Sequence, residues 1–407
     1  MTLTRPEQML LQAISAAVRG EQVAWTGEMP PGIWREFIRL SVEQNVLPMV
    51  YEAVYACPAA QEETLLRSCR QAVIRAVTAQ TIRAAEFLRL YKALTAQGLH
   101  PLVVKGVICR AIYPNGDDRI SSDEDILIPA NEWDACCEAL LNFGMENVGS
   151  VNGNGHEIGW HKDSLYIELH RSLFPPENKA YGQLNDFFRD IHTRPSAYPV
   201  ERAHVVHSMC PYDHLLYLIL HAYKHFIHSG FGIRQICDIG LWAAHYHTEI
   251  DWARLYVQCE EAHALHFAAA VFQVAKETLR IDVVLPEKWK AIKIDSEPML
   301  HDLLSGGVYG GTDMSRLHSA STTVNAVAAD RSRKRYSVLT SVFPAREQLL
   351  GQYPELQQHP VRLPIVWLKR IAKYAHSLAQ HSGGNSAETL RIAAERRELL
   401  KTYGIIE

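Results

Sequence analysis

The spacing of apolar residues divides the chain into three stretches. Over residues 1–98 the apolar positions recur every three to four residues, which predicts helices. The long run over 64–98 ends at Gly98, a residue typical of helix C-termini. Helical spacing returns from Pro211 onward. Between these stretches the apolar residues form short runs or alternate with polar ones, so the middle of the chain predicts β-strands.

The middle stretch predicts a small mixed sheet with helices between some of its strands. The expected strands cover residues 101–104, 124–128, 156–161 and 165–170, and the expected helices cover 107–113 and 131–143. Residues 162–164 fit the turn of a hairpin between the last two strands. In the second hairpin strand, apolar residues take one face, whereas the other face carries Tyr166, Glu168 and His170.

We therefore expect an α+β protein in which a small mixed β-sheet core is flanked by N-terminal and C-terminal helical regions. The expected regions are an N-terminal helical region (1–98), the core (99–203), a C-terminal helical region (204–380), and a linker with a terminal helix (381–407). Residues 305–335 are rich in Gly, Ser, Thr and Asp, which predicts a long loop. Residues 381–388, HSGGNSAE, predict a flexible linker.

Composition and charge exclude several classes of protein. Hydrophobic residues make up 47% and charged residues 21% of the 407 residues, as in soluble globular proteins. The net charge of −4 disfavours long nucleic acids as partners, because these require clusters of basic residues. No apolar run reaches the roughly 18 to 20 residues that cross a bilayer. Since the first residues also lack the apolar stretch of a signal peptide, we expect a cytoplasmic protein without membrane contact.

Asp123 and Asp125 stand at the start of the strand predicted at 124–128. Side chains alternate along a strand, so these two carboxylates point to one side and Glu124 to the other. Neighbouring carboxylates repel each other unless a cation lies between them. Mg²⁺ suits such oxygen ligands and binds proteins through one or two carboxylates together with substrate phosphates. Asp123 and Asp125 are therefore predicted to be metal ligands and catalytic residues.

Other residues nearby suit a substrate that carries phosphates. Gly106 precedes a predicted helix, whose first backbone N–H groups favour anions, and Lys105 and Arg119 are the nearest cations. Glu168 is the predicted third carboxylate, either as a metal ligand or as the acceptor of a proton. Plain structural explanations also exist: Lys105 and Arg119 could pair with nearby acids, and Glu168 could simply face solvent.

The stretch 105–128, KGVICRAIYPNGDDRISSDEDILI, resembles the nucleotidyltransferase-like family of the polymerase-β superfamily, whose members are often described only as uncharacterised nucleotidyltransferases. The shared pattern is a Lys-Gly turn, a helix with a tyrosine, an arginine, and Asp-x-Asp before an apolar strand: Lys105, Gly106, Tyr113, Arg119, Asp123 and Asp125. Residues 166–174, YIELHRSLF, and the helical stretches 213–226 and 233–242 resemble later parts of the family, at Glu168, His170, His221, His225, Arg234 and Asp238. The resemblance covers about residues 10–380.

The chain departs from the wider superfamily at the turn, where Gly-Ser or Gly-Gly is usual. Here the turn is Gly106-Val107, so a serine hydroxyl that would contact phosphate is missing. We expect Lys105 or Ser122 to replace that contact. Ser121 and Ser122 also stand just before the aspartates, where glycine is frequent in similar sequences. Neither change removes a predicted metal ligand, so these departures concern nucleotide affinity more than the chemistry.

Four histidines share one face of a predicted helix: His214, His221, His225 and His228. Two histidines four residues apart can bind zinc, as in some hydrolases. The sequence from His221 to His225, however, lacks the glutamate of the HExxH motif and contains Lys224. Two arrangements remain open. The histidines and Lys224 could lie near a bound nucleotide, or the stripe could pack against the core beside an ion pair of Asp238 with Arg234.

Together the residues and the resemblance predict an Mg²⁺-dependent nucleotidyltransferase. It would move a nucleoside monophosphate from an NTP, expected to be ATP, to an unidentified acceptor hydroxyl or phosphate and release pyrophosphate. The predicted nucleotide-binding residues are Lys105, Gly106, Arg119, Ser122, His221, Lys224 and His225. Two alternatives stay open: a nucleotide-binding protein of the same fold with weak or lost catalysis, and a zinc hydrolase built on the histidine stripe.

Overall fold

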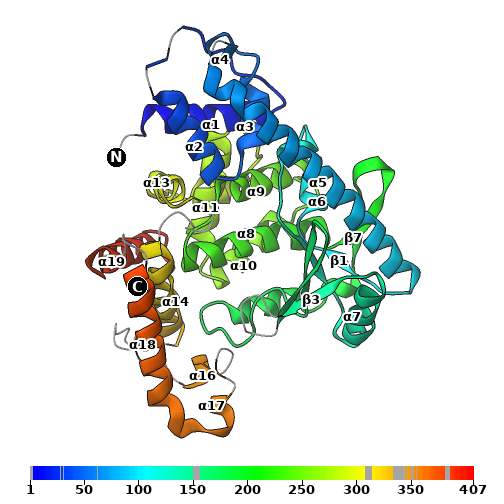
Figure 1. The fold of residues 1–407 in the computed structure, drawn as a ribbon, viewed down its shortest axis with the longest axis vertical. Helices are drawn as coiled ribbons and strands as arrows, with labels where there is room; N and C mark the ends of the chain where they lie inside the picture. The colour runs from blue at the N-terminus through cyan, green and yellow to red at the C-terminus, as the bar shows by residue number, and fades with distance from the viewer. Residues whose placement is uncertain are drawn as a thin grey trace.

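The computed structural model describes residues 3–27, 29–30, 32–61, 63–149, 156–307, 314–332, 343, 346–349, 353, 355–380 and 386–407. Helices, a central sheet and a second set of helices follow one another along the chain (Figure 1). The N-terminal helices are α1 (Arg5–Ala17), α2 (Ile33–Glu43), α3 (Leu47–Val54), α4 (Pro58–Gln61) and α5 (Thr64–Ala96). Within the described residues, no helix has both the length and the apolar character needed to cross a membrane.

The central sheet has the strand order β1-β2-β5-β4-β3. Its strands are β1 (Leu102–Val103), β2 (Glu124–Leu127), β3 (Glu146–Gly149), β4 (Glu157–Lys162) and β5 (Leu165–His170). β2 and β5 run parallel, and the other neighbours are antiparallel. The hairpin turn contains Asp163 with a φ of 50°, a conformation that Asp tolerates. This mixed sheet between helical parts confirms the predicted α+β fold.

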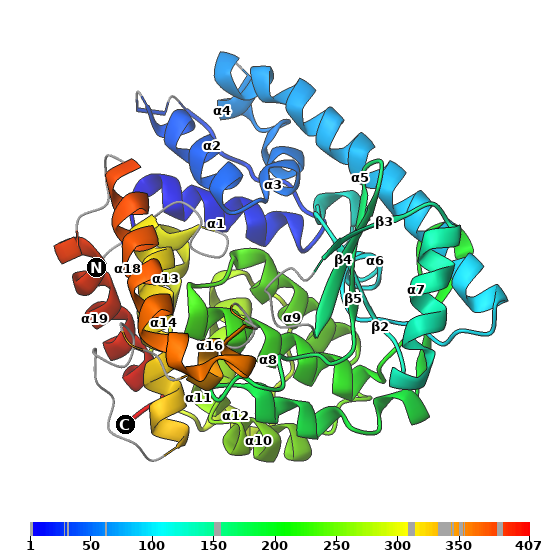
Figure 2. The ribbon, with the colours of Figure 1, turned by 60° about the horizontal axis from the view of Figure 1, so that its bottom comes forward.

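Helices cover both faces of the sheet. Figure 2 shows α5 and α7 (Trp133–Asn142) on one side, and α8 (Pro211–His228) and α9 (Ile233–His245) on the other. Between β1 and β2 lies the short helix α6 (Val107–Arg110), and a separate ribbon pairs β6 (Ser196–Pro199) with β7 (Val205–Ser208). The remaining helices are α10 (Trp252–Glu261), α11 (Leu265–Gln273), α12 (Glu287–Lys290), α13 (Glu297–Gly306), α14 (Met314–Arg331), α16 (Arg346–Leu349), α17 (Glu355–Gln358), α18 (Leu363–Gln380) and α19 (Ser386–Thr402).

α8 is the central helix of the C-terminal part. It begins with Pro211, whose fixed φ suits the first helical position, and it is buried on nearly all sides, including the face that carries His214 and His221. One hydrophobic cluster reaches from Met9 in α1 to Ile406 after α19 and includes α8. The N-terminal helices, the sheet and the C-terminal helices therefore share a core.

The prediction of a long loop over 305–335 is wrong for residues 314–331, which form α14. Its sequence is rich in Ser, Thr and Ala and has a weak apolar pattern, so local signals do not identify it as a helix. Tertiary contacts with α8 explain it: Thr323 donates to the carbonyl of His228, and Arg331 donates to the hydroxyl of Tyr223. Of the linker predicted at 381–388, residues 381–385 lie outside the described residues, and 386–388 begin α19.

Candidate active site

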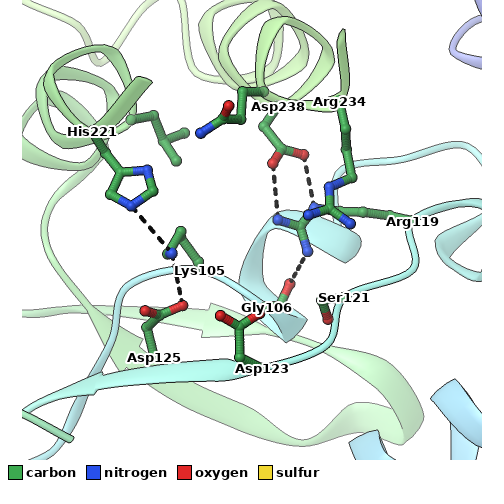
Figure 3. Close-up of a pocket in the computed structure, with 11 residues that line it drawn as sticks. Lys105, Gly106, Arg119, Ser121, Asp123, Asp125, His221, Arg234 and Asp238 are labelled. Carbon is green, nitrogen blue, oxygen red and sulfur yellow. Dashed lines mark hydrogen bonds and ion pairs between the residues drawn. The ribbon is translucent and has the colours of Figure 1, made fainter. Parts of the chain in front are cut away.

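A pocket lies between β2 with its preceding loop and the helices α8 and α9 (Figure 3). It contains about 450 Å³ of atom-free space, part of which is open to solvent. One wall comes from the first half of the chain, through Lys105, Gly106, Arg119, Ser121, Asp123 and Asp125. The other wall comes from α8 and α9, through Leu218, His221, Arg234, Gln235 and Asp238.

Asp123 and Asp125 point into this pocket side by side (Figure 3). Glu124 points to the opposite side of β2, where it accepts a hydrogen bond from the backbone N–H of Val107 at 2.8 Å. The predicted alternation of these three carboxylates is confirmed. Asp125 is 2% exposed, whereas Asp123 is half-buried, so the pair extends from the interior of the pocket toward its opening.

Gly106 and Glu124 are packed tightly against each other. Gly106 has a φ of 64°, and a Cβ atom on it would lie 1.6 Å from Oε2 of Glu124. Burial raises the pKa of Glu124 to about 8, partly offset by the hydrogen bond from Val107. The backbone N–H of Val107 is thus used by Glu124, and the expected free N–H at this helix start is not available for phosphate. Gly106 is needed here to make room for Glu124.

Asp125 lies between two cationic or hydrogen-bonding groups. Its Oδ2 is 3.0 Å from Nζ of Lys105, and its Oδ1 is 3.0 Å from Nε2 of His170. Burial opposes ionisation of Asp125, but Lys105 and His170 together hold its pKa below the ordinary value. Lys105 also approaches Nε2 of His221 at 3.3 Å. Lys105 therefore connects the carboxylates on β2 with the histidines on α8.

Glu168 stands beside Asp125 on the neighbouring parallel strand. The register aligns these two residues, and the side chain of Glu168 is 18% exposed. Burial raises the pKa of Glu168 to about 7, and the charge of Asp125 adds to this rise. A cation bound near this carboxyl group would stabilise its ionised form and lower its pKa. The structure thus brings the three predicted acidic residues to one face of the sheet.

Asp125, Glu168 and His170 form a group that fits a metal ion. One ligand atom from each lies within 4.8 Å of the others. Carboxylate oxygens and an imidazole nitrogen are common metal ligands. Asp123 is not in this group but lines the adjoining pocket. Sequence reasoning did not assign a site role to His170, although its alternation with Glu168 on one strand indicated that both share a face.

Arg119 is part of a buried ion pair that the sequence prediction assigned differently. Its Nε and Nη2 donate to Oδ1 and Oδ2 of Asp238, each at 2.8 Å, and its Nη1 donates to the carbonyl of Gly106 at 3.1 Å. Tyr113 donates to the same carboxylate at 2.7 Å. The Asp238–Arg234 pair belonged to one of the two arrangements that the sequence left open; Asp238 pairs with Arg119 instead, and Arg234 donates to the carbonyl of Ile120. Arg119 lines the pocket, but three of its donors serve to connect the Lys-Gly turn with α9.

Ser121 lines the pocket, whereas Ser122 does not. Ser122 donates to Oδ1 of Asp123 at 3.0 Å and is exposed. Ser121 is buried, lines the pocket, and its hydroxyl has no hydrogen-bond partner among the described residues. Ser121 is therefore better placed than Ser122 to supply the hydroxyl missing from the turn. The sequence could not separate these adjacent serines, because an irregular loop fixes their directions.

The histidine stripe divides between packing and the pocket. His214 is fully buried, stacks on Trp242 with ring centroids 4.0 Å apart, and lies 3.1 Å from the hydroxyl of Ser208. His221 lines the pocket, and its Nε2 lies 3.2 Å from Nε2 of His225. Burial, with Lys105 nearby, lowers the pKa of His221 well below its usual value.

The positions of Lys224 and the α8 histidines bear on the zinc alternative. Burial lowers the pKa of Lys224, whose strongest opposite charge is that of Glu157. Two groups of three potential metal ligands occur among the described residues, and neither includes a histidine of α8. The structure gives no support to a zinc hydrolase built on His221 and His225.

Comparison with known proteins adds one match. A family described as uncharacterised nucleotidyltransferase matches residues 30–280, a range that includes the sheet, the pocket, α8 and α9. No curated protein and no solved structure is significantly similar to the chain.

Proposed function

This chain belongs to the uncharacterised nucleotidyltransferase family and is an enzyme of the nucleotidyltransferase type, and we propose that it transfers a nucleoside monophosphate from an NTP to an acceptor hydroxyl or phosphate. We propose ATP as the donor and Mg²⁺ as the ion that accompanies it. The observation that supports this most is the meeting of Asp123, Asp125 and Glu168 on one face of the sheet beside a pocket with basic residues.

The reaction exchanges one phosphorus–oxygen bond for another. The acceptor oxygen attacks the α-phosphorus, a new P–O bond forms, and the bond to the bridging oxygen of the β-phosphate breaks, so that pyrophosphate leaves. A divalent cation bound by Asp123, Asp125 and Glu168 would neutralise the triphosphate and align the attacking and leaving oxygens. Lys105 lies beside this position and is suited to bind phosphate oxygens as a mobile point charge.

Other pocket residues have supporting tasks in this proposal. Ser121 and Arg234 both line the wall that would face the phosphates. The Arg119–Asp238 pair fixes the Lys105-Gly106 turn against α9, so that Lys105 and Asp125 keep their relative positions. Two tasks suit Glu168: it can bind the cation, or its carboxylate can accept the proton that the acceptor hydroxyl loses.

The proposal is tested by incubating the enzyme with cell extract, Mg²⁺ and each NTP labelled at the α-phosphate. We expect one acceptor to become labelled and pyrophosphate to appear in equal amount. Asp125→Asn should lower the rate at least about 100-fold, as expected when a group that organises transition-state charge is lost. Asp163→Asn is the matched control, because it removes a carboxylate from a turn where Asn tolerates the same positive φ.

Two results would contradict the proposal. Undiminished transfer by the Asp123→Asn and Asp125→Asn variants would show that these carboxylates are not the catalytic ones. NTP binding in calorimetry without pyrophosphate release, across all extracts and nucleotides, would indicate a protein that binds nucleotide without transferring it.

A further inference from the structure

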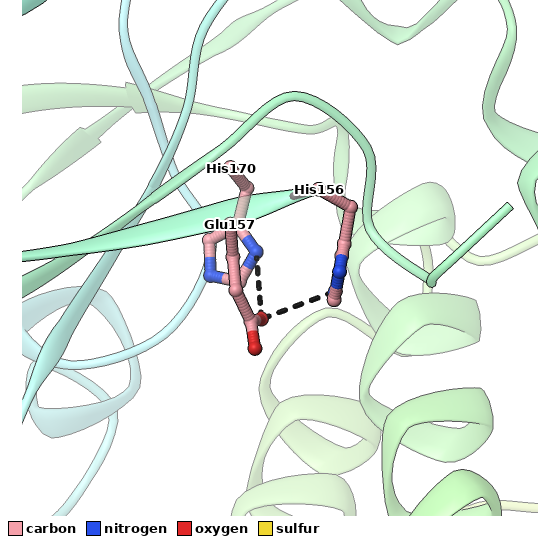
Figure 4. Close-up of side chains that lie close together, drawn as sticks. All are labelled: His156, Glu157 and His170. Atoms are coloured by element: carbon pink, nitrogen blue, oxygen red, sulfur yellow. Dashed lines mark ion pairs between the residues drawn. The ribbon is translucent and has the colours of Figure 1, made fainter. Parts of the chain in front are cut away.

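The imidazole of His170 lies between two groups of acidic residues. Its Nε2 is 3.0 Å from Oδ1 of Asp125 and 3.7 Å from Oε2 of Glu168. Its Nδ1 is 3.5 Å from Oε2 of Glu157, which is also 3.1 Å from Nε2 of His156 (Figure 4). The side chains of His170 and Glu157 are 6% and 3% exposed. Each nitrogen of this buried ring thus faces a different carboxylate environment.

Strand register explains this placement. Glu157 is aligned with His170 across the antiparallel pair β4–β5, and Asp125 is aligned with Glu168 across the parallel pair β2–β5. Residues two apart on a strand share a face, so His170 joins Glu168 on the side that faces α8. The result is a row of polar side chains across three strands, from Glu157 through His170 to Asp125.

The distances on the Nε2 side fit one shared ion. Metal–nitrogen and metal–oxygen bonds measure about 2.0–2.2 Å, so two ligands of one ion are at most about 4.4 Å apart. The separations of 3.0 Å and 3.7 Å from Nε2 to Asp125 and Glu168 both satisfy this limit. The site also has a route for an ion, because Asp125 lines the pocket and Glu168 is partly exposed.

The Nδ1 side is arranged to hold the ring in place. Oε2 of Glu157 lies 3.5 Å from Nδ1 of His170, without forming a hydrogen bond in the ion-free structure, and 3.1 Å from Nε2 of His156. An ion bound at Nε2 would replace the 3.0 Å hydrogen bond between Nε2 and Asp125 and leave the ring proton on Nδ1, the nitrogen that faces Glu157. Metal-binding histidines commonly have such a carboxylate partner, which orients the ring and raises its basicity.

We propose that Asp125, Glu168 and His170 bind a divalent transition-metal ion, Mn²⁺, and that Glu157 is the positioning residue for His170. The inference rests on the proposed function and deepens it. An imidazole in the ligand set favours a transition-metal ion over Mg²⁺, and Mn²⁺ also suits carboxylates and phosphate oxygens. The Mg²⁺ that accompanies the NTP would then use Asp123 and Asp125 on the pocket side.

His156, Glu157 and His170 also lie close enough together to hold a metal ion. A neutral imidazole has one nitrogen lone pair, so His170 cannot bind ions on both sides at once. The Asp125 side is favoured because it adjoins the pocket, whereas His156 and Glu157 are buried and do not line it. In the proposal, His156 fixes the position of the Glu157 carboxylate, and Glu157 in turn orients the ring of His170.

Titration of the nucleotide-free protein with Mn²⁺ and with Mg²⁺ tests the proposal. We expect Mn²⁺ to bind at least about 10-fold more tightly than Mg²⁺, because imidazole ligands favour transition metals. Pulsed electron paramagnetic resonance of the Mn²⁺ complex should show coupling to a directly bound nitrogen. His170→Asn retains a polar group near the position of Nδ1 but removes Nε2. It should abolish the nitrogen coupling and the preference for Mn²⁺.

The positioning role of Glu157 has its own variant. Glu157→Gln keeps the size of the side chain and should weaken Mn²⁺ binding about 10- to 100-fold, the usual effect of losing a partner of a ligating histidine. Glu157→Asp retains a carboxylate on a shorter side chain, so this variant should bind Mn²⁺ more tightly than Glu157→Gln does. His161→Asn, on the same hairpin but paired with exposed Glu146, is the matched control and should leave Mn²⁺ binding unchanged.

Absence of nitrogen coupling in the wild-type Mn²⁺ complex would overturn the proposal without any variant. So would unchanged Mn²⁺ affinity in a folded His170→Asn variant. These measurements contain no nucleotide, so they are independent of the transfer assay. If Mn²⁺ binding depends on His170 but no transfer activity is found, only the proposed function is contradicted. If the enzyme is active in transfer but the His170→Asn variant binds Mn²⁺ as tightly as the wild type, only this inference is contradicted.

Discussion

Gly106 lies against the carboxylate of Glu124, so close that a Cβ atom at position 106 would be 1.6 Å from Oε2. The contact joins the Lys-Gly turn to the strand that carries Asp123 and Asp125. Glu124 also accepts a hydrogen bond from the backbone N–H of Val107 at 2.8 Å. The middle residue of the acidic triplet therefore fixes the turn, and the two outer residues face the pocket.

Gly106→Ala should destabilise the protein strongly. The new methyl group would overlap Glu124 at a positive φ, and we expect a loss of about 3 to 5 kcal/mol in the free energy of unfolding. Gly98→Ala is the control, because Gly98 has a φ of 78° but a methyl group there would meet nothing within 4 Å, so a loss of about 1 to 2 kcal/mol is expected. Equal losses in urea unfolding of the two variants would contradict the importance of the contact.

Asp238→Asn should also destabilise the fold. The change leaves the guanidinium of Arg119 buried without its charge partner, which costs about 3 to 5 kcal/mol in comparable pairs. Glu36→Gln removes an exposed partner of Arg39 and should cost less than about 1 kcal/mol. The comparison uses thermal or urea unfolding. A loss below about 1 kcal/mol in Asp238→Asn would mean that the pair does not hold the turn against α9.

Lys105→Met should have opposite effects on the binding of the nucleotide and on the binding of the divalent cation. Lys105 is 3.0 Å from Asp125, so removing its positive charge should strengthen binding of a divalent cation to the carboxylates. Loss of a cation that contacts phosphate should raise KM for the NTP, by about 10- to 100-fold for a charge-assisted contact. Calorimetry with the metal alone and steady-state kinetics measure the two effects. A fall in metal affinity, with KM unchanged, would contradict the role proposed for Lys105.

The burial of Asp118 leads us to expect that the stability of the protein depends on pH. Burial raises its pKa to about 7, helped by the charges of Glu52 and Asp117, so the folded state favours the neutral carboxyl group. The contribution of Asp118 to the free energy of unfolding should therefore fall as the pH rises from about 4 to about 7, and stay level above that. Asp118→Asn removes this fall and should be more stable than the wild type above about pH 7, by up to about 4 kcal/mol.

Urea unfolding at a series of pH values checks this expectation. Asp163→Asn, in the exposed hairpin turn, should keep the wild-type profile. Parallel profiles for wild type and Asp118→Asn would show that Asp118 does not titrate differently in the folded protein.

Local rules of chain geometry determined part of the site from the sequence. Side chains alternate along a strand because the extended backbone is pleated with a repeat of two residues, so the shared direction of Asp123 and Asp125 could be predicted without a fold. The same rule placed Glu168 opposite its apolar neighbours. The hairpin over β4 and β5 followed from two short strand patterns and a polar turn. These features depend on residues close together in the sequence.

Tertiary structure decided which distant residues meet. Arg119 and Asp238 are 119 residues apart, and neither local periodicity nor composition indicates their pairing. The register between strands aligned Asp125 with Glu168 and His170 with Glu157. Packing against α8 stabilised α14, whose own sequence predicted a loop. The physical reason is that strand register and helix packing depend on the burial of the whole core, whereas the direction of a side chain along its own strand depends only on local geometry.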